Sequence, residues 1–106
     1  MEKVAFRLKV RGEMIDEYVR RHDQVWPEML EALQRTGWKN YSIFLDRADG
    51  TLFGYFETEN LQDSLAGMAR AEVNARWQAD MAPFFENLDV PADQGFIKLD
   101  QVFFLQ

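Results

Sequence analysis

Residues 39–59 have the sequence KNYSIFLDRADGTLFGYFETE, which shows the pattern of a β-hairpin. Aromatic and branched apolar side chains, which favour strands, lie on both sides of the short polar segment RADG. That segment ends in Asp49 and Gly50, the residue types that tight hairpin turns prefer. We therefore expect two antiparallel strands, over about residues 39–46 and 51–59.

Two further strands are predicted near the ends of the chain. Residues 4–10, VAFRLKV, alternate apolar and polar side chains, as a half-buried strand does. Residues 96–105, FIKLDQVFFL, predict a closing strand, and a loop punctuated by Pro91 and Gly95 precedes it. Gly54, inside the second hairpin strand, indicates either a β-bulge or a close approach of other atoms.

Helical periodicity fills the two segments between these strands. The first predicted helical segment covers residues 13–36, and Gly37 supplies the left-handed position that commonly ends a helix. The second begins after Asn60, a good N-cap residue, and continues to about residue 83. We expect it to be broken near residues 70–72 into two short helices.

The predicted order is β-α-β-β-α-β, the ferredoxin-like arrangement of the α+β class, with helices on one face of an antiparallel sheet. The strands carry large apolar side chains on both faces, for example Ile43 on one and Phe44 on the other. Because the helices can cover only one face, we expect a second copy of the chain to cover the other. The result would be a homodimer in which two copies form a dimeric α/β-barrel.

Composition limits the possible functions. A chain of 106 residues with 47% hydrophobic content is enough for a single domain, residues 1–106. The net charge of −6 leaves no basic face for nucleic acid. The chain has no cysteine and no apolar run of about 20 residues, so we expect a cytoplasmic protein without disulfides or a membrane span.

The single histidine, His22, lies in the middle of an apolar helical face. At about 100° per residue, Tyr18, His22 and Trp26 share one apolar arc of the first helical segment. Pro27 cannot donate a hydrogen bond to the carbonyl of Asp23, so the segment must kink just after His22. One solution is that Asp23 caps a new helical segment.

Two interpretations of His22 remain open from the residues themselves. An inward histidine is ordinarily a core residue whose nitrogens find partners. Its ordinary pKa of about 6.5 also suits it to general acid or base catalysis. A metal site at His22 is disfavoured because the chain lacks further nitrogen and sulfur ligands: it has no second histidine and no cysteine. No nucleophile-elbow or phosphate-loop motif is present, which disfavours acyl and phosphoryl transfer.

Two weaker signals accompany the histidine. Val73, Trp77 and Met81 form one face of the second helical segment, a pattern that is more often core than binding site. Asn40 and Tyr41 open a hairpin strand, where their polar groups can reach a cavity.

Five ordered segments nevertheless resemble one family. EYVRRHDQVWPEM, NYSIFLD, LFGYFE, RWQADM and QVFFL, spaced over nearly the whole chain, resemble the L-rhamnose mutarotases. The resemblance implies a dimeric α/β-barrel enzyme, an isomerase that interconverts the α and β anomers of L-rhamnose without a metal or organic cofactor.

The resemblance also implies roles for particular residues. The proton donor of the family corresponds to His22, and its sugar-contacting tyrosines correspond to Tyr18 and Tyr41. Many members have two consecutive tryptophans where this chain has Trp77 and Gln78. Two explanations are open: Gln78 replaces stacking with a hydrogen bond, or the preferred sugar differs. The loop ENLDVPADQG also departs from the family pattern, and no role is transferred to it.

Two alternatives compete with the mutarotase. One is a haem-binding protein or monooxygenase on the same dimeric α/β-barrel architecture, with His22 as an iron ligand. The other is a non-catalytic, dimeric small-molecule-binding protein in which His22 is merely packed.

Overall fold

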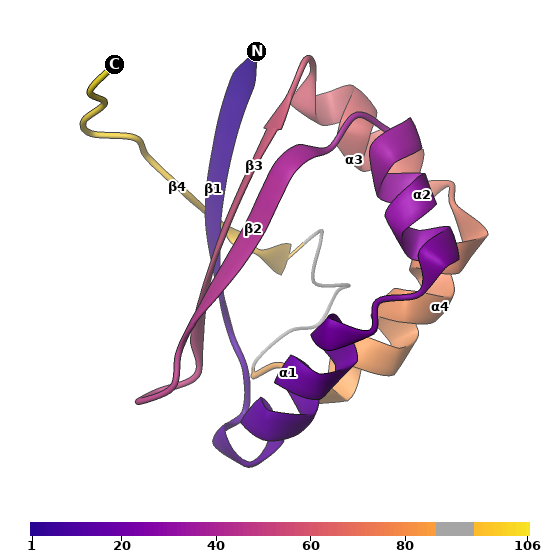
Figure 1. Cartoon of the computed structure of the whole chain (residues 1–106), viewed down its shortest axis with the longest axis vertical. Helices are drawn as coiled ribbons and strands as arrows, with labels where there is room; N and C mark the ends of the chain where they lie inside the picture. The colour runs from indigo at the N-terminus through magenta and orange to yellow at the C-terminus, as the bar shows by residue number, and fades with distance from the viewer. Residues whose placement is uncertain (87–94) are drawn as a thin grey trace.

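The computed structural model describes residues 1–86 and 95–106, and its centre is one antiparallel sheet with the helices on one face (Figure 1). The strand order is β2-β3-β1-β4. The strands are β1 (Glu2–Lys9), β2 (Lys39–Asp46), β3 (Thr51–Thr58) and β4 (Ile97–Leu99). This is the predicted ferredoxin-like α+β fold.

The hairpin of β2 and β3 forms as the sequence predicts. Gly50 takes a φ of 81°, and a side chain there would collide with the Val10 carbonyl oxygen. Gly54 does not form a bulge, because β1 and β3 pair in unbroken register with Phe6 opposite Gly54. A Cβ atom on Gly54 would lie 2.1 Å from the Phe6 ring, so this glycine is needed for a close approach. The hairpin's irregularity lies between Lys39 and Ser42.

The first helical segment is divided into three pieces: η1 (Gly12–Met14), α1 (Ile15–Asp23) and α2 (Pro27–Arg35). The predicted kink after His22 is a complete break. The prediction that Asp23 caps the second piece is wrong, since Asp23 ends α1 and Trp26 is the N-cap of α2. Pro27 takes the first helical position, where its missing N–H costs nothing. Gly37 has the predicted positive φ, 92°.

The second helical segment breaks where expected. It consists of α3 (Leu61–Ala69), α4 (Glu72–Met81) and the short η2 (Ala82–Phe84). Asn60 is the predicted N-cap, and its side-chain oxygen accepts a hydrogen bond of 3.0 Å from the Asp63 amide.

The closing strand is shorter than predicted. Of residues 96–105, only Ile97–Leu99 pair with β1. The following apolar residues from Val102 to Leu105 are exposed, and Lys3 Nζ lies 3.3 Å from the centre of the Phe104 ring. Most of the loop predicted before this strand lies outside the described residues.

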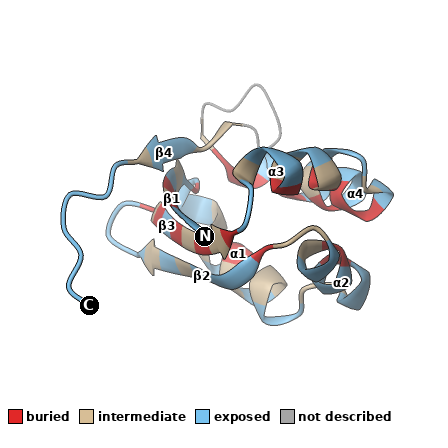
Figure 2. Cartoon of the chain, turned by 90° about the horizontal axis from the view of Figure 1, so that it is seen from above, coloured by how far each residue is buried: buried red, intermediate tan, exposed pale blue. Residues whose placement is uncertain are grey.

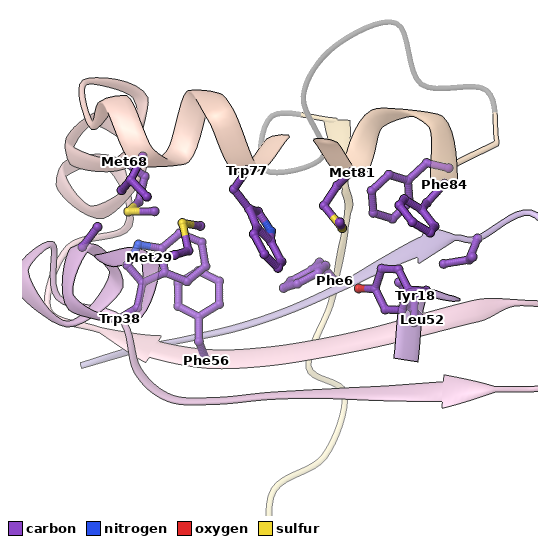
Figure 3. Packing of buried hydrophobic residues seen from close by; sticks show 14 of the residues in the cluster. Phe6, Tyr18, Met29, Trp38, Leu52, Phe56, Met68, Trp77, Met81 and Phe84 are labelled. Carbon is purple, nitrogen blue, oxygen red and sulfur yellow. The ribbon is translucent and has the colours of Figure 1, made fainter. Parts of the chain in front are cut away.

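The core lies between the helices and the inner face of the sheet, where their buried sides meet (Figure 2). Phe6, Leu52 and Phe56 of the sheet face helical side chains that include Met68 and Met81 (Figure 3). The outer face of the sheet carries Phe44, which is 66% exposed, and Phe53, which is 44% exposed. These two residues pair across β2 and β3, so the predicted second apolar face is present.

Candidate active site

Two adjoining hollows lie between the inner face of β2 and the helices α1 and α4, with volumes of about 500 and 660 Å³ including their open mouths. Six side chains line both hollows: His22, Trp38, Tyr41, Ile43, Trp77 and Gln78. Tyr18 lines the first hollow, and Asn74 lines the second.

The imidazole of His22 is oriented by its own helix. Nδ1 lies 2.9 Å from the carbonyl oxygen of Tyr18, four residues earlier. A carbonyl can only accept, so Nδ1 carries the hydrogen and, in the neutral ring, Nε2 carries the lone pair. The Tyr18 ring stacks on the imidazole with 4.0 Å between centres, and the Trp77 ring meets it edge to face at 5.5 Å. The ring is therefore held in one orientation at the wall of both hollows.

Burial favours the neutral form of this imidazole. It lowers the pKa of His22 below 6.5, and the hydrogen bond to the Tyr18 carbonyl opposes part of that shift. At neutral pH the ring is consequently uncharged, with a basic nitrogen.

The two tyrosines differ in burial. Tyr18 is only 5% exposed, and burial, reinforced by the charge that Tyr41 can carry, raises the pKa of its phenol. Tyr18 thus keeps its proton and can donate a hydrogen bond. Tyr41 is 37% exposed, near the start of β2, with its ring 5.2 Å from that of Trp38.

The irregular start of β2 places Tyr41. Asn40 has a φ of 50°, which asparagine tolerates better than most residues, and the pairing register shifts between Lys39 and Ser42. Asn40 then donates to Glu57 at 3.1 Å, while the Tyr41 ring contacts the Phe6 and Phe56 rings on the inner side. A β-bulge of this kind commonly redirects a side chain next to a functional site.

Trp77 projects from α4 toward the sheet (Figure 3). Its ring meets the Trp26 ring edge to face at 5.0 Å, and it is only 6% exposed. Because it lines both hollows, Trp77 is part of the core and also part of the cavity wall.

Two of the lining residues that were not among the predicted site residues are Asn74 and Trp38. Asn74 is 5% exposed and is joined to Gln78 by a hydrogen bond of 3.1 Å. A polar residue one turn before Gln78, beside the buried Val73, was the available signal. Trp38 is 7% exposed and stacks on Phe56 at 4.0 Å, and its signal was its place directly after Gly37.

The structure brings all five predicted site residues, Tyr18, His22, Tyr41, Trp77 and Gln78, to the same pair of hollows. Within the described part of the chain there is no group of three or more side chains suited to hold a metal ion. The helices of that part include none long and apolar enough to cross a membrane.

Sequence comparisons converge on one family. A model of the L-rhamnose mutarotase family matches residues 3–105. The L-rhamnose mutarotase of Bacillus subtilis (strain 168) is 42% identical over 106 residues, covering 99% of each protein. That of Shouchella clausii (strain KSM-K16) is 42% identical over 89 residues, 84% of this chain and 85% of that protein.

Solved structures agree with the sequence comparisons. The crystal structure of L-rhamnose mutarotase from Formosa agariphila superimposes with a TM-score of 0.81 at 30% identity, covering 100% of both chains. A candidate antibiotic biosynthesis monooxygenase from Nitrosomonas europaea gives 0.63 at 9% identity, covering 95% of this chain and 89% of that one. At such low identity, the second likeness shows a shared fold alone.

Proposed function

The chain belongs to the L-rhamnose mutarotase family and is an isomerase that interconverts the anomers of L-rhamnose, and from this premise we propose that His22 is its proton-transfer residue. The observation that carries the proposal is the position of His22. Its imidazole lines both hollows, Nδ1 is engaged by the Tyr18 carbonyl, and Nε2 is left as the basic nitrogen.

The reaction requires two coupled proton transfers. The anomeric hydroxyl O1–H loses its proton to Nε2 of His22, the ring oxygen O5 gains a proton, and the C1–O5 bond breaks to leave an aldehyde. Rotation about C1–C2 turns the aldehyde, O5 adds to its other face, and the protons return. The sugar ends as the opposite anomer, and His22 is neutral again.

The hydroxyl groups of Tyr18 and Tyr41 orient the sugar in this scheme. Tyr18, whose raised pKa keeps it protonated, donates a hydrogen bond rather than losing a proton. The complementary transfer to O5 uses a tyrosine hydroxyl, a carboxylate or water.

The aromatic walls suit a deoxy-sugar. Trp77 and Trp38 line both hollows with flat apolar surface, against which sugar C–H groups and a methyl group can pack. L-Rhamnose, a 6-deoxyhexose, offers both.

We also propose a homodimer built from a single mutarotase domain, residues 1–106, in the cytoplasm. The exposed pair Phe44 and Phe53 supports the dimer, because an apolar sheet face is a typical site of association. The absence of cysteine is compatible with a reducing compartment.

The test is saturation-transfer NMR of the exchange between the L-rhamnose anomers. We expect the wild-type protein to accelerate exchange and His22→Ala to reduce kcat/KM by about 10²-fold or more, the usual contribution of a positioned acid or base. Arg20→Ala is the matched control on the same helix, since its side chain is 72% exposed and lines neither hollow.

Two results would contradict the proposal. Equal exchange rates for the wild type and His22→Ala would remove His22 from the chemistry. The haem-binding alternative would be supported by a different pair of results. The wild-type protein would not accelerate anomer exchange above the uncatalysed rate, and it would give a Soret band with haemin that His22→Ala abolishes.

A further inference from the structure

Trp38 and Tyr41 line both hollows although they are three positions apart in the sequence. Their ring centres lie 5.2 Å apart, and both rings pack against that of Phe56, on the inner face of the sheet. Figure 3 shows the stacked pair of Trp38 and Phe56. In a regular strand, residues separated by an odd number of positions point to opposite faces. The alternation must therefore be reversed between Trp38 and Tyr41.

The reversal is the β-bulge at the start of β2. Between the pairing of Lys39 with Glu57 and that of Ser42 with Tyr55, β2 has two residues and β3 has one. Such an extra residue shifts the alternation of side chains by one position. Asn40, the first of the two, has left-handed backbone geometry, with a φ of 50°. The bulge thus allows residues on both sides of Asn40 to face the hollows.

A carboxylate on β3 holds Asn40 from its side chain. Glu57 Oε1 accepts a hydrogen bond of 3.1 Å from Asn40 Nδ2, and Glu57 Oε2 accepts one of 2.7 Å from the hydroxyl of Tyr55. Both bonds lower the pKa of Glu57, the one from Tyr55 most, so the acceptor is ionised at neutral pH. Hydrogen bonds to an ionised acceptor are stronger than those between neutral groups.

Glu57 and Tyr55 lie on the face of the sheet away from the site. They alternate along β3 with the buried Phe56, which faces the helices. Neither residue is among the described residues that line the two hollows. Any influence of Glu57 on the site must therefore pass through the backbone of Asn40.

We propose that Asn40 is a positioning residue, held by Glu57, whose left-handed backbone brings Trp38 and Tyr41 to the same wall of the active site. Residues other than glycine rarely adopt this backbone geometry, and asparagine tolerates it better than most, so a side-chain bond to Glu57 stabilises the bulge. The expected effect on catalysis rests on the mutarotase function, whereas the expected effect on the two rings does not.

NMR tests the placement of the rings directly. The wild-type protein should show nuclear Overhauser cross-peaks between the ring protons of Trp38 and Tyr41. We expect Asn40→Val to lose them, because a β-branched residue resists a positive φ. Asn40→Gly should keep them, because glycine adopts a positive φ freely. Ser42→Val, at an exposed position in the regular part of β2, is the matched control and should also keep them.

Kinetics of anomer exchange test the consequence for the site. We expect Asn40→Val to lower kcat/KM about 10-fold or more, since misplacing a group by about 1 Å can cost up to about 10²-fold. Asn40→Gly should restore most of this loss. A merely structural Asn40 would instead lower the melting temperature of Asn40→Val and leave kcat/KM unchanged at temperatures where the variant is folded.

Variants of Glu57 keep the test decisive if Asn40→Val does not fold. Glu57→Leu removes both hydrogen bonds and should lower kcat/KM about 3-fold or more, as for one lost hydrogen bond. Glu57→Gln, which keeps an acceptor for Asn40, should restore the wild-type value. In the Asn40→Gly protein, Glu57→Leu should have no further effect, because glycine needs no bond to hold its backbone. Glu59→Leu, at an exposed position just beyond β3, is the control.

The outcomes separate this inference from the function on which its kinetic part rests. A wild-type protein that does not accelerate anomer exchange overturns the mutarotase function, and the NMR comparison still tests the placement of the rings. Cross-peaks between Trp38 and Tyr41 that persist in Asn40→Val overturn the positioning role. A loss of activity in Glu57→Leu that is equally large in the Asn40→Gly protein overturns the role of the bond between Glu57 and Asn40.

Discussion

His22 combines partial burial with a single hydrogen bond to its own helix, and this combination sets its protonation state. Burial lowers its pKa, and the Tyr18 carbonyl recovers only part of the shift. In the proposed mechanism, the neutral ring, with its hydrogen on Nδ1, is the form that accepts a proton from O1. Acidification should therefore stop the reaction by protonating Nε2.

The pH profile of kcat/KM should show this directly. We expect the rate constant to be level through neutral pH and to fall on the acid side around a pKa below 6.5, because burial disfavours the imidazolium. Saturation-transfer NMR at low sugar concentration, repeated across pH, measures the profile. An acid limb centred at or above 6.5 would contradict it.

The same shift affects stability with a defined sign. The unfolded chain binds a proton at His22 near pH 6.5, whereas the folded protein binds it only at a lower pH. The stabilising contribution of His22 is complete above pH 6.5 and is lost as the pH falls through the folded pKa. His22→Gln should accordingly flatten the dependence of unfolding free energy on pH in that window.

At the level of single residues, helical periodicity in the sequence predicts which side chains face inward. Tyr18, His22 and Trp77 face inward because their spacing places them on apolar helix faces. The place of Asn74 beside Val73 indicates that it faces inward, but its hydrogen bond to the Met68 carbonyl could not be predicted, because it depends on the break between α3 and α4. A buried amide depends on where a distant carbonyl lies.

Among the elements, the pairing of β1 with β3 places the Phe6 ring where a side chain at position 54 would lie. Phe6 is 4% exposed and lies opposite Gly54, where it fills the space that a side chain would need. The pairing of these two strands brings Phe6 to the first hollow, so their register also shapes the site.

Gly54→Ala should strain this contact. A Cβ atom would lie 2.1 Å from Phe6 Cζ, and the enclosed ring has little room to move, so we expect a loss of about 1–3 kcal/mol in unfolding free energy. Chemical denaturation measures the change. Gly12→Ala, where a Cβ atom would meet nothing within 4 Å, is the control and should change stability little. Equal losses for both variants would contradict the explanation.

Element boundaries show where sequence reasoning fails and why. The break near Pro27 is predictable because proline lacks an N–H, but the choice of Trp26 over Asp23 as N-cap depends on tertiary packing. The strand predicted over 96–105 shrinks to Ile97–Leu99 because its length depends on pairing with β1, which no local pattern specifies.

Across the whole molecule, the helices lie on one side of the sheet (Figure 2). The hollows lie on the same side as the helices, and the exposed apolar pair Phe44 and Phe53 lies on the other. This division follows from strand alternation and was predictable from sequence. The proposed dimer would bury the outer face without obstructing the hollows on the inner face.

Charge on the outer face should disrupt the dimer. We expect Phe44→Glu/Phe53→Glu to weaken association by about 30-fold or more, because desolvated carboxylates would replace a central aromatic contact. Sedimentation velocity over a concentration series measures the dissociation constant. Leu30→Glu, at a position 48% exposed on α2, is the control and should leave association unchanged. A double variant as tightly dimeric as the wild type would show that the interface lies elsewhere.

The bond from His22 to the Tyr18 carbonyl closes within one turn of α1, a helix of nine residues. The hydrogen bond that orients the imidazole thus lies within a single helix, and of the two rings packed against it only Trp77 comes from another element, α4. To reproduce this geometry in another protein, a designer would need Ile15–Asp23 together with an aromatic side chain in the place of Trp77.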